Sequence, residues 1–421
     1  MNDLCAKLLD TDMDKALLRL YPHHQLAAQK ERYSSILDSF HKEFGEGTPA
    51  FFSAPGRTEV GGNHTDHNHG RVLAAGINLD AVAAAVPREG TVIREKSAGH
   101  ALNVVDIASL APVPQEIGHS SALIRGVCAG FVQRGYTIGA FDAAVCSDVL
   151  SGSGLSSSAA YEVLIGTVLN YLYNDGKVSA VEIAQIAQFA ENVYFGKPCG
   201  LMDQMASSVS GFVTIDFADP SEPVIEKVDF DFAACGHSLC IVNTGGSHND
   251  LTDDYAAVRG EMEAVAAVFG KKVLRDVEPE EFYASLAQVR SQVSDRAIIR
   301  AMHFFNENLR VEKEVDALAK GDFEAFKQTV IDSGYSSYMY NQNVFTTKQP
   351  TDQPVSLALA LSAEILKGKG AWRVHGGGFA GTIQAFVPDE LLETYKSQME
   401  AVFGEGSCMV LQIRPYGGVR V

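Results

Sequence analysis

Four side chains that can bind metals or form hydrogen bonds crowd the stretch GGNHTDHNHG at residues 61–70. His64, Asp66, His67 and His69 fall within six positions of one another. Imidazole and carboxylate groups bind transition metals, and both also accept hydrogen bonds from hydroxyl groups. Because no distant residue supplies an obvious closing ligand, we expect no transition-metal site at this turn.

A glycine-serine loop, LSGSGLSSSAA at residues 150–160, has the composition of a phosphate-binding loop. Gly152 and Gly154 permit close approach of the backbone to an anion. Ser156–Ser158 follow at the start of an apolar-periodic helix, whose free N–H groups and positive dipole end favour phosphate. The loop lacks the ending of a Walker A loop and the acidic partner of a dinucleotide fingerprint. A flexible loop capped by serine is the simpler alternative.

Two carboxylates stand in the segment AENVYFGKPCGLMDQMASS at residues 190–208. Glu191 falls late in a predicted helix. Asp203 follows CGLM, a context that gives little reason for a carboxylate unless it is paired. Taken by itself, Asp203 is more simply explained as a helix N-cap than as a catalytic base.

Hydrophobic patterns predict the elements that position these residues. A helix is expected after the glycine-serine loop, and another from Ser179, where Glu182 completes a capping box. The glycine cluster at 376–381 is explained by a tight strand-to-helix turn. The other expected elements are mainly helical regions at 1–46 and 250–335, strands at 71–86, 140–149, 211–217 and 238–245, and a βαβ-like stretch containing 372–388.

The 421-residue length suggests two domains, with turn-forming residues near 218–222 as the boundary. The net charge of −18 disfavours binding to nucleic acids and anionic membranes. It also repels a nucleotide, so a phosphate site must supply compensation from backbone amides, a cation or a few basic side chains. Seven scattered cysteines, no long apolar run and no signal-peptide pattern predict a cytoplasmic protein.

Three ordered motifs resemble those of the GHMP kinase superfamily and, within it, the galactokinase family. GRTEVGGNHTDHNHG at 56–70 is similar to the family's sugar motif, GSGLSSSAA at 152–160 to its phosphate loop, and HGGGFAG at 375–381 to its third motif. CGLMDQ at 199–204 also matches, and TDDYAAVRGE and HFFNENLRV look like family segments. The resemblance covers nearly the whole chain after about residue 30.

The resemblance implies an α+β GHMP kinase fold of two domains. Residues 1–218 would form an N-terminal domain similar to domain 2 of ribosomal protein S5, and residues 219–421 a ferredoxin-like C-terminal domain. The implied reaction is ATP-dependent phosphorylation of the anomeric hydroxyl of galactose or a close relative, with Mg²⁺ as cofactor. The expected partners are ATP and a small monosaccharide, without nucleic acid or membrane. The oligomeric state stays open, with a monomer as the expectation.

The matched positions also imply site residues. Asp203 would act at the anomeric oxygen as base or orienting group, and Arg57 would pair with it and neutralise the transferring phosphoryl group. Glu191 and one loop serine, Ser157 or Ser158, would hold Mg²⁺. The phosphates would bind Gly152, Ser153, Gly154, Leu155, Ser156, Ser157 and Ser158. The sugar would contact Asn63, His64, Asp66, Gly200 and Tyr255, of which Tyr255 could equally be a core aromatic.

Departures from the family pattern gather in the sugar motif. Glu59 stands where the family has Asn, Gly61 where it has Ile, Asn63 where it has Glu, and His67 where it has Tyr. The family Glu resembles an acceptor for the sugar 6-hydroxyl, so Asn63 predicts altered recognition of that end of the sugar. A kinase for a C6-modified sugar such as galacturonate is one alternative. A non-catalytic galactose sensor is another, although the complete phosphate loop argues against it.

Overall fold

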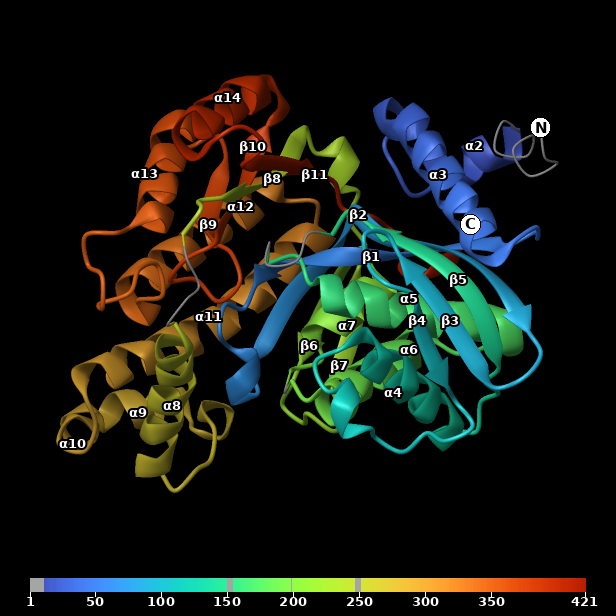
Figure 1. Cartoon of the computed structure of the whole chain (residues 1–421). Coiled ribbons are helices and arrows are strands. Elements are labelled where there is room, and N and C mark those ends of the chain that lie inside the picture. Colours follow the sequence, from blue (N-terminus) through green and yellow to red (C-terminus); the bar gives the residue numbers. More distant parts are fainter. Residues whose placement is uncertain (1–10, 150–153, 198, 247–250) are drawn as a thin grey trace.

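The computed structural model describes residues 11–149, 154–197, 199–246 and 251–421, in which helices surround two β-sheets (Figure 1). The larger sheet has the order β12-β1-β2-β5-β3-β4, with the β6–β7 hairpin attached to β2. Its strands are β1 (Ala50–Gly61), β2 (Arg71–Arg88), β3 (Val92–Ser97), β4 (Asn103–Asp106), β5 (Ala140–Ser147), β6 (Phe212–Asp216), β7 (Val224–Val228) and β12 (Val419–Arg420). The smaller sheet has the order β11-β8-β10-β9, from β8 (His237–Asn243), β9 (Ala371–Val374), β10 (Thr382–Pro388) and β11 (Cys408–Leu411).

Helices cover both sheets, and the predicted α+β class is confirmed. Those beside the larger sheet are α2 (Thr11–Leu18), α3 (Leu26–Phe44), α4 (Ser120–Gln133), α5 (Ser157–Tyr173), α6 (Ala180–Phe189) and α7 (Met202–Val209). The later ones are α8 (Thr252–Val268), α9 (Pro279–Ala284), α10 (Leu286–Arg290), α11 (Asp295–Ala319), α12 (Phe323–Ser336), α13 (Pro354–Leu366) and α14 (Leu392–Phe403). Within the described ranges, none of the helices is long and apolar enough to cross a membrane.

Strand β2 is buried on both faces, which explains its run of small and β-branched residues. Successive side chains of a strand point to opposite faces. Ala81 and Ala83 belong to the core formed with α4 and α5, whereas Val82 and Ala84 belong to the core formed with α3. The helix expected within 1–46 is confirmed as α3, which buries Tyr33, Ile36, Leu37 and Phe40 on one face, with Phe44 partly buried. The capping box of Ser179 and Glu182 at the start of α6 is also confirmed.

The second glycine cluster does not form the expected strand-to-helix turn. Residues 375–381 join β9 to β10, which pair antiparallel as a hairpin. Gly376 and Gly378 have φ values of 65° and 76°, so the turn needs residues without a side chain. The helix of the expected βαβ unit is α14, which follows β10 and leads to β11. Both strands run antiparallel to β8, which lies between them, so the unit is a split βαβ.

The expected domain boundary at 218–219 falls in the turn between β6 and β7. These strands pair with each other, Asp216 opposite Val224, and belong to the larger sheet. The last strand, β12, returns to the same sheet beside β1. Residues beyond 219 therefore contribute to the larger sheet, and the division into 1–218 and 219–421 stays a proposal.

A buried charge cluster joins the N-terminal helices, the larger sheet and the C-terminal segment. Asp80 of β2 is fully buried and accepts hydrogen bonds from Arg32 at 2.7 Å, Arg414 at 2.8 Å and the Tyr21 hydroxyl at 2.6 Å. Burial raises the pKa of this carboxyl, but the two arginines outweigh burial and lower it overall. Its stabilising contribution is therefore complete at neutral pH and is lost as the pH falls through its folded-state pKa.

We expect Asp80→Asn to lower the free energy of unfolding by about 3 kcal/mol or more, because it leaves the buried Arg414 guanidinium without its paired carboxylate and removes one of the two carboxylates that bind Arg32, the other being Asp148. Equilibrium unfolding in urea at pH 7 would measure the change. The control is Asp316→Asn, which removes an exposed partner of Lys320 and should cost less than about 0.5 kcal/mol. Equal losses in the two variants would contradict the assignment of Asp80 as a structural anchor.

Candidate active site

A bidentate ion pair links strand β1 to helix α7. Arg57 Nε donates to Asp203 Oδ1 at 2.7 Å, and Arg57 Nη2 donates to Asp203 Oδ2 at 2.8 Å. Asp203 lies in the first turn of α7, where Leu201 occupies the N-cap position, so the N-cap alternative for Asp203 is wrong. The fold therefore brings together the two residues predicted to be catalytic, Arg57 and Asp203, which are 146 positions apart in the sequence.

The phosphate loop closes around this pair. The Arg57 amide donates to the carbonyl of buried Leu155 at 3.0 Å, and Arg57 Nη1 donates to the Gly154 carbonyl. Ser156 Oγ donates to Asp203 Oδ2 at 2.7 Å. Gly154 and Ser156 have φ values of 75° and 59°, which turn the chain into α5 at Ser157. The predicted phosphate residues Gly152 and Ser153 lie outside the described residues.

The electrostatics of the pair fix its charge state. Burial raises the pKa of Asp203, but Arg57, together with Ser156 and Lys197, outweighs burial and the net shift is downward. Burial lowers the pKa of Arg57, and Asp203 more than compensates, so the guanidinium pKa is raised. Asp203 is therefore ionised at neutral pH, and a carboxylate of low pKa is a weak proton acceptor.

Glu191 and Ser158 form the second polar group of the site. Glu191 lies in a π-helical turn (Ala190–Phe195) that continues α6, and it is 2% exposed. Its Oε1 accepts from Ser158 Oγ at 3.1 Å and from Lys197 Nζ at 3.0 Å, and its Oε2 accepts from Gln204 Nε2 at 2.6 Å. Of the two serines proposed for Mg²⁺, Ser158 is thus the one hydrogen-bonded to Glu191. A carboxylate and a hydroxyl are oxygen donors of the kind that suits Mg²⁺.

Three residues predicted to bind the sugar contact the carbonyl groups of the glycine turn. Asn63 Nδ2 donates to the Gly376 carbonyl at 2.7 Å, His64 Nε2 lies 2.9 Å from the Gly377 carbonyl, and the Tyr255 hydroxyl donates to the Gly378 carbonyl at 3.0 Å. The Tyr255 ring packs edge-on against Phe379. The glycine turn is therefore fixed by the sugar motif and by α8.

Asn63 is fully buried and its amide is saturated by protein groups. Besides Gly376, its Nδ2 donates to Glu59 Oε1 at 2.9 Å, and its Oδ1 accepts from Asn343 Nδ2 at 2.9 Å and Ser337 Oγ at 3.2 Å. This geometry gives Asn63 no free group for a sugar and disfavours its predicted role as a sugar contact.

Two of the three histidines in the stretch 61–70, His64 and His67, contact each other. His64 Nδ1 lies 3.3 Å from His67 Nε2, and Asn68 Nδ2 donates to His67 Nδ1 at 3.0 Å. Because an amide nitrogen only donates, His67 Nδ1 is the acceptor and its Nε2 carries the proton that points to His64. Burial, followed by the charge of His64, holds the pKa of His67 well below its usual value.

Asp66 and Gly200, both predicted sugar contacts, lie against each other. A Cβ added at Gly200 would stand 3.1 Å from Asp66 Oδ2, so glycine keeps this carboxylate accessible. Both residues line a cavity of about 440 Å³, together with His67, His69 and Arg259. Desolvation raises the pKa of Asp66, although His64 opposes the shift.

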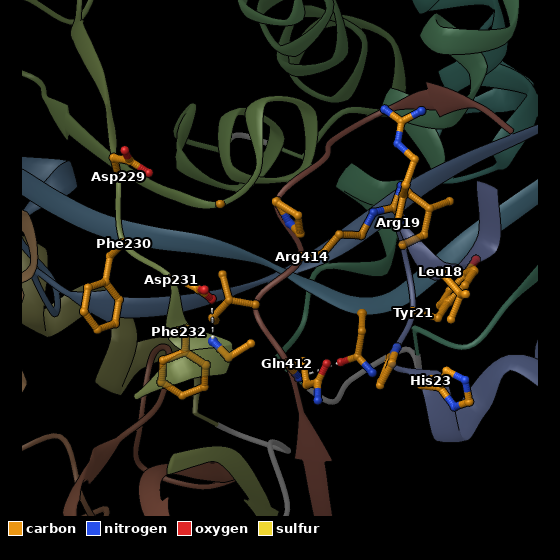
Figure 2. Close-up of a pocket in the computed structure, with 17 residues that line it drawn as sticks. Leu18, Arg19, Tyr21, His23, Asp229, Phe230, Asp231, Phe232, Gln412 and Arg414 are labelled. Carbon is orange, nitrogen blue, oxygen red and sulfur yellow. Dashed lines mark hydrogen bonds between the residues drawn. The ribbon is translucent and has the colours of Figure 1, made fainter. Parts of the chain in front are cut away.

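Two other cavities are larger, each of about 510 Å³, and only one of them is lined by predicted site residues. One is lined by Ser157, Ser158, Glu95 and Tyr161 and opens beside the first turn of α5. The other, shown in Figure 2, lies between segments 18–23, 229–233 and 412–415 and contains none of the predicted site residues.

Sequence reasoning missed several residues that the fold brings to the site. His375 and Thr382 flank Gly154, since a Cβ added there would lie 3.3 Å from His375 Nδ1 and 3.2 Å from Thr382 Oγ1. Gln204 stands beside the predicted Asp203 in CGLMDQ, and Lys197 precedes that motif. The match of CGLMDQ was a signal for Gln204, but no pattern pointed to Lys197.

Comparisons with known proteins agree with this geometry. The galactokinase galactose-binding signature matches residues 38–87, and the GHMP kinase N-terminal domain matches residues 122–211. Galactokinase from Lactococcus lactis, solved with galactose, is 24% identical, with 92% of this chain and 100% of that chain covered and a TM-score of 0.77.

Two further solved structures share the fold. A D-glycero-D-manno-heptose 1-phosphate kinase from Bacteroides thetaiotaomicron is 16% identical, with a TM-score of 0.59 and coverage of 88% of this chain and 98% of that chain. Phosphomevalonate kinase from Streptococcus pneumoniae, solved with phosphomevalonate and AMPPNP, is 14% identical, with a TM-score of 0.57 and coverage of 88% and 99%. The chain therefore carries a galactokinase galactose-binding signature and a GHMP kinase N-terminal domain on a fold that it shares with a galactokinase, and these matches support a phosphotransferase that acts on a sugar hydroxyl.

Proposed function

We propose that the protein is an ATP-dependent sugar-1-kinase that phosphorylates the anomeric hydroxyl of galactose or a close relative. The observation that supports this proposal most is the Arg57–Asp203 pair joined to the phosphate loop through Gly154 and Ser156. Phosphoryl transfer depends mainly on positioning and on stabilisation of charge, and this arrangement offers both.

In this proposal Asp203 orients the acceptor hydroxyl and Arg57 stabilises the phosphoryl group in transit. The lowered pKa of Asp203 supports an orienting role over that of a strong general base. Because the pair is bidentate and Ser156 holds the second carboxylate oxygen, both charged groups are fixed before substrate arrives.

The nucleotide is proposed to bind with its phosphates at the start of α5 and the rest of the molecule in the adjoining cavity of about 510 Å³. The AMPPNP bound to the S. pneumoniae relative supports a nucleotide site in this fold. Glu191 and Ser158 would hold Mg²⁺, which neutralises phosphate charge when bound. Gln204 holds the other oxygen of Glu191 and so orients this carboxylate.

The sugar is proposed to bind at Asp66 and Gly200, where a carboxylate can accept hydrogen bonds from sugar hydroxyl groups. The galactose bound to the L. lactis relative supports galactose as the first candidate. A sugar with a carboxylate at C6, such as galacturonate, is the second candidate, because Arg259 lines the same cavity as Asp66. The intact Arg57–Asp203 pair speaks against a purely sensory role.

We further propose a cytoplasmic monomer. The cysteines among the described residues are free thiols, which is typical of proteins in a reducing compartment.

We expect Asp203→Asn to keep the fold and to lower turnover on the best sugar by at least about 10²-fold, since Arg57 loses its counter-charge and the acceptor its orienting group. Steady-state kinetics would measure the loss. Asp216→Asn is the matched control, because Asp216 is also partly exposed and paired with two arginines, Arg71 and Arg275, outside the site. Turnover of Asp203→Asn equal to that of the control would remove Asp203 from the mechanism.

We expect activity to require Mg²⁺ or Mn²⁺, to stop with EDTA, and to be restored by either ion. Glu191→Gln should weaken Mn²⁺ binding by roughly tenfold or more, because the amide lacks the negative charge that attracts the ion. Elemental analysis should find no stoichiometric zinc. Zinc that is lost when His64 and His67 are both replaced would show that the histidine turn is a metal site.

We expect Asn63→Asp to lower kcat/KM for galactose, galacturonate and 6-deoxygalactose by the same factor. The new carboxylate would face Glu59 and the Gly376 carbonyl, so it would disturb the turn without removing a contact to any one sugar. Kinetics with the three sugars would show this. Arg259→Gln is the comparison, because it should act on galacturonate alone if that sugar is bound. A changed preference in Asn63→Asp would show that Asn63 contacts the sugar.

A further inference from the structure

Lys197 brings a second cation, besides Arg57, to the acidic groups of the site. It lies between the π-helical turn and CGLMDQ, and its Nζ stands 3.0 Å from Glu191 Oε1. Its positive charge also helps to lower the pKa of Asp203, so the ammonium lies within electrostatic reach of both carboxylates. The sequence analysis assigned no role to Lys197.

The two partners of this contact differ sharply in burial. The Lys197 side chain is 61% exposed, whereas the Glu191 side chain is 2% exposed. Burial lowers the pKa of Lys197, but the nearby acidic groups, Glu191 first and then Asp203, together outweigh burial and raise it, so the side chain is a charged ammonium at neutral pH. An exposed cation therefore neutralises a buried carboxylate.

The Glu191 oxygens have limited room for further partners. Oε2 is held by Gln204, and Oε1 already accepts from Ser158 and Lys197. A divalent cation bound to Glu191 would repel the ammonium on the same oxygen, because like charges a few ångströms apart oppose each other strongly. The long Lys197 side chain, mostly in solvent, is free to swing away while its backbone stays in place.

We propose that Lys197 is a placeholder cation, which neutralises Glu191 in the free enzyme and moves to the nucleotide phosphates when a divalent cation takes its place. This inference rests on the proposed kinase function and names a further phosphate-binding residue. It also meets the need for local positive charge on a chain with a net charge of −18. The ammonium starts beside Ser158, in the first turn of α5, where the phosphates are proposed to bind.

The simpler alternative is an ordinary surface ion pair, like that of Lys177 and Asp175, whose side chains are 74% and 83% exposed. Such pairs contribute little and have no link to ligand binding. The two accounts differ in their consequences, since only a placeholder should oppose metal binding and support nucleotide binding.

The test compares the wild-type protein with Lys197→Met, Lys197→Arg and the control Lys177→Met. Calorimetric titration with Mn²⁺ alone should show roughly fivefold tighter binding to Lys197→Met, because a competing cation has been removed. Titration with AMPPNP in saturating Mg²⁺ should show roughly fivefold weaker binding to the same variant, because a phosphate partner is lost. Lys197→Arg should stay near the wild type in the nucleotide titration, and Lys177→Met should match it in both.

Opposite shifts of metal and nucleotide affinity in Lys197→Met would support the exchange. Unchanged nucleotide affinity, or Mn²⁺ affinity that is unchanged or weaker, would overturn it. If the wild-type protein binds no AMPPNP at all, the proposed kinase function itself fails, which is a separate result.

Discussion

The Arg57–Asp203 ion pair is the interaction on which the arrangement of the active site depends. Arg57 is 9% exposed, so removal of its partner would leave a largely buried charge without compensation. The same two side chains also hold the phosphate loop, through Gly154 and Ser156. One ion pair therefore sets the distance between strand β1, the start of α5 and the start of α7. Gly154 and Ser156 have left-handed backbone conformations, and such conformations persist only where surrounding contacts, here those to Arg57 and Asp203, hold them.

Under the proposed function, charge compensation is the second constraint, because a chain with a net charge of −18 has to bind an acidic nucleotide. The described site meets it with three kinds of positive group: the N-terminal amides of α5, the Arg57 guanidinium and the Lys197 ammonium. The two side-chain cations are paired with carboxylates of the protein, Arg57 with Asp203 and Lys197 with Glu191. Under the proposed function these carboxylates, Glu191 buried and Asp203 partly buried, take the place of the phosphate anions, which limits the cost of keeping the cations in a partly dry site.

The local sequence pattern was sufficient to predict those elements that are determined by interactions between residues close in the sequence. The apolar face of α3, the Ser179–Glu182 capping box and the helix after the phosphate loop all follow from spacing within a few residues. The order of motifs was sufficient to pair Arg57 with Asp203. The hairpin at 375–381, the return of β12 to the larger sheet and the contact of Lys197 with Glu191 depend on partners far along the chain, which spacing does not encode. Asn63 shows the same limit, since its type suggested a sugar contact and its burial determined another role.

The departures at 59 and 63 are best understood as one exchange. The family pattern has Asn at the first position and Glu at the second, whereas this chain has Glu59 and Asn63, and the two side chains touch, with Asn63 Nδ2 2.9 Å from Glu59 Oε1. The pair keeps one amide and one carboxylate, but the carboxylate now sits on β1, where Arg373 binds it at 2.5 Å. A glutamate at 63 beside Glu59 would add a second carboxylate to the reach of the Arg373 guanidinium, and a third carboxylate, Glu307, already accepts the backbone N–H of residue 63 at 3.2 Å. Restoring the family residue at 63 alone would therefore crowd three acids, whereas exchanging both residues together would keep the charge balance.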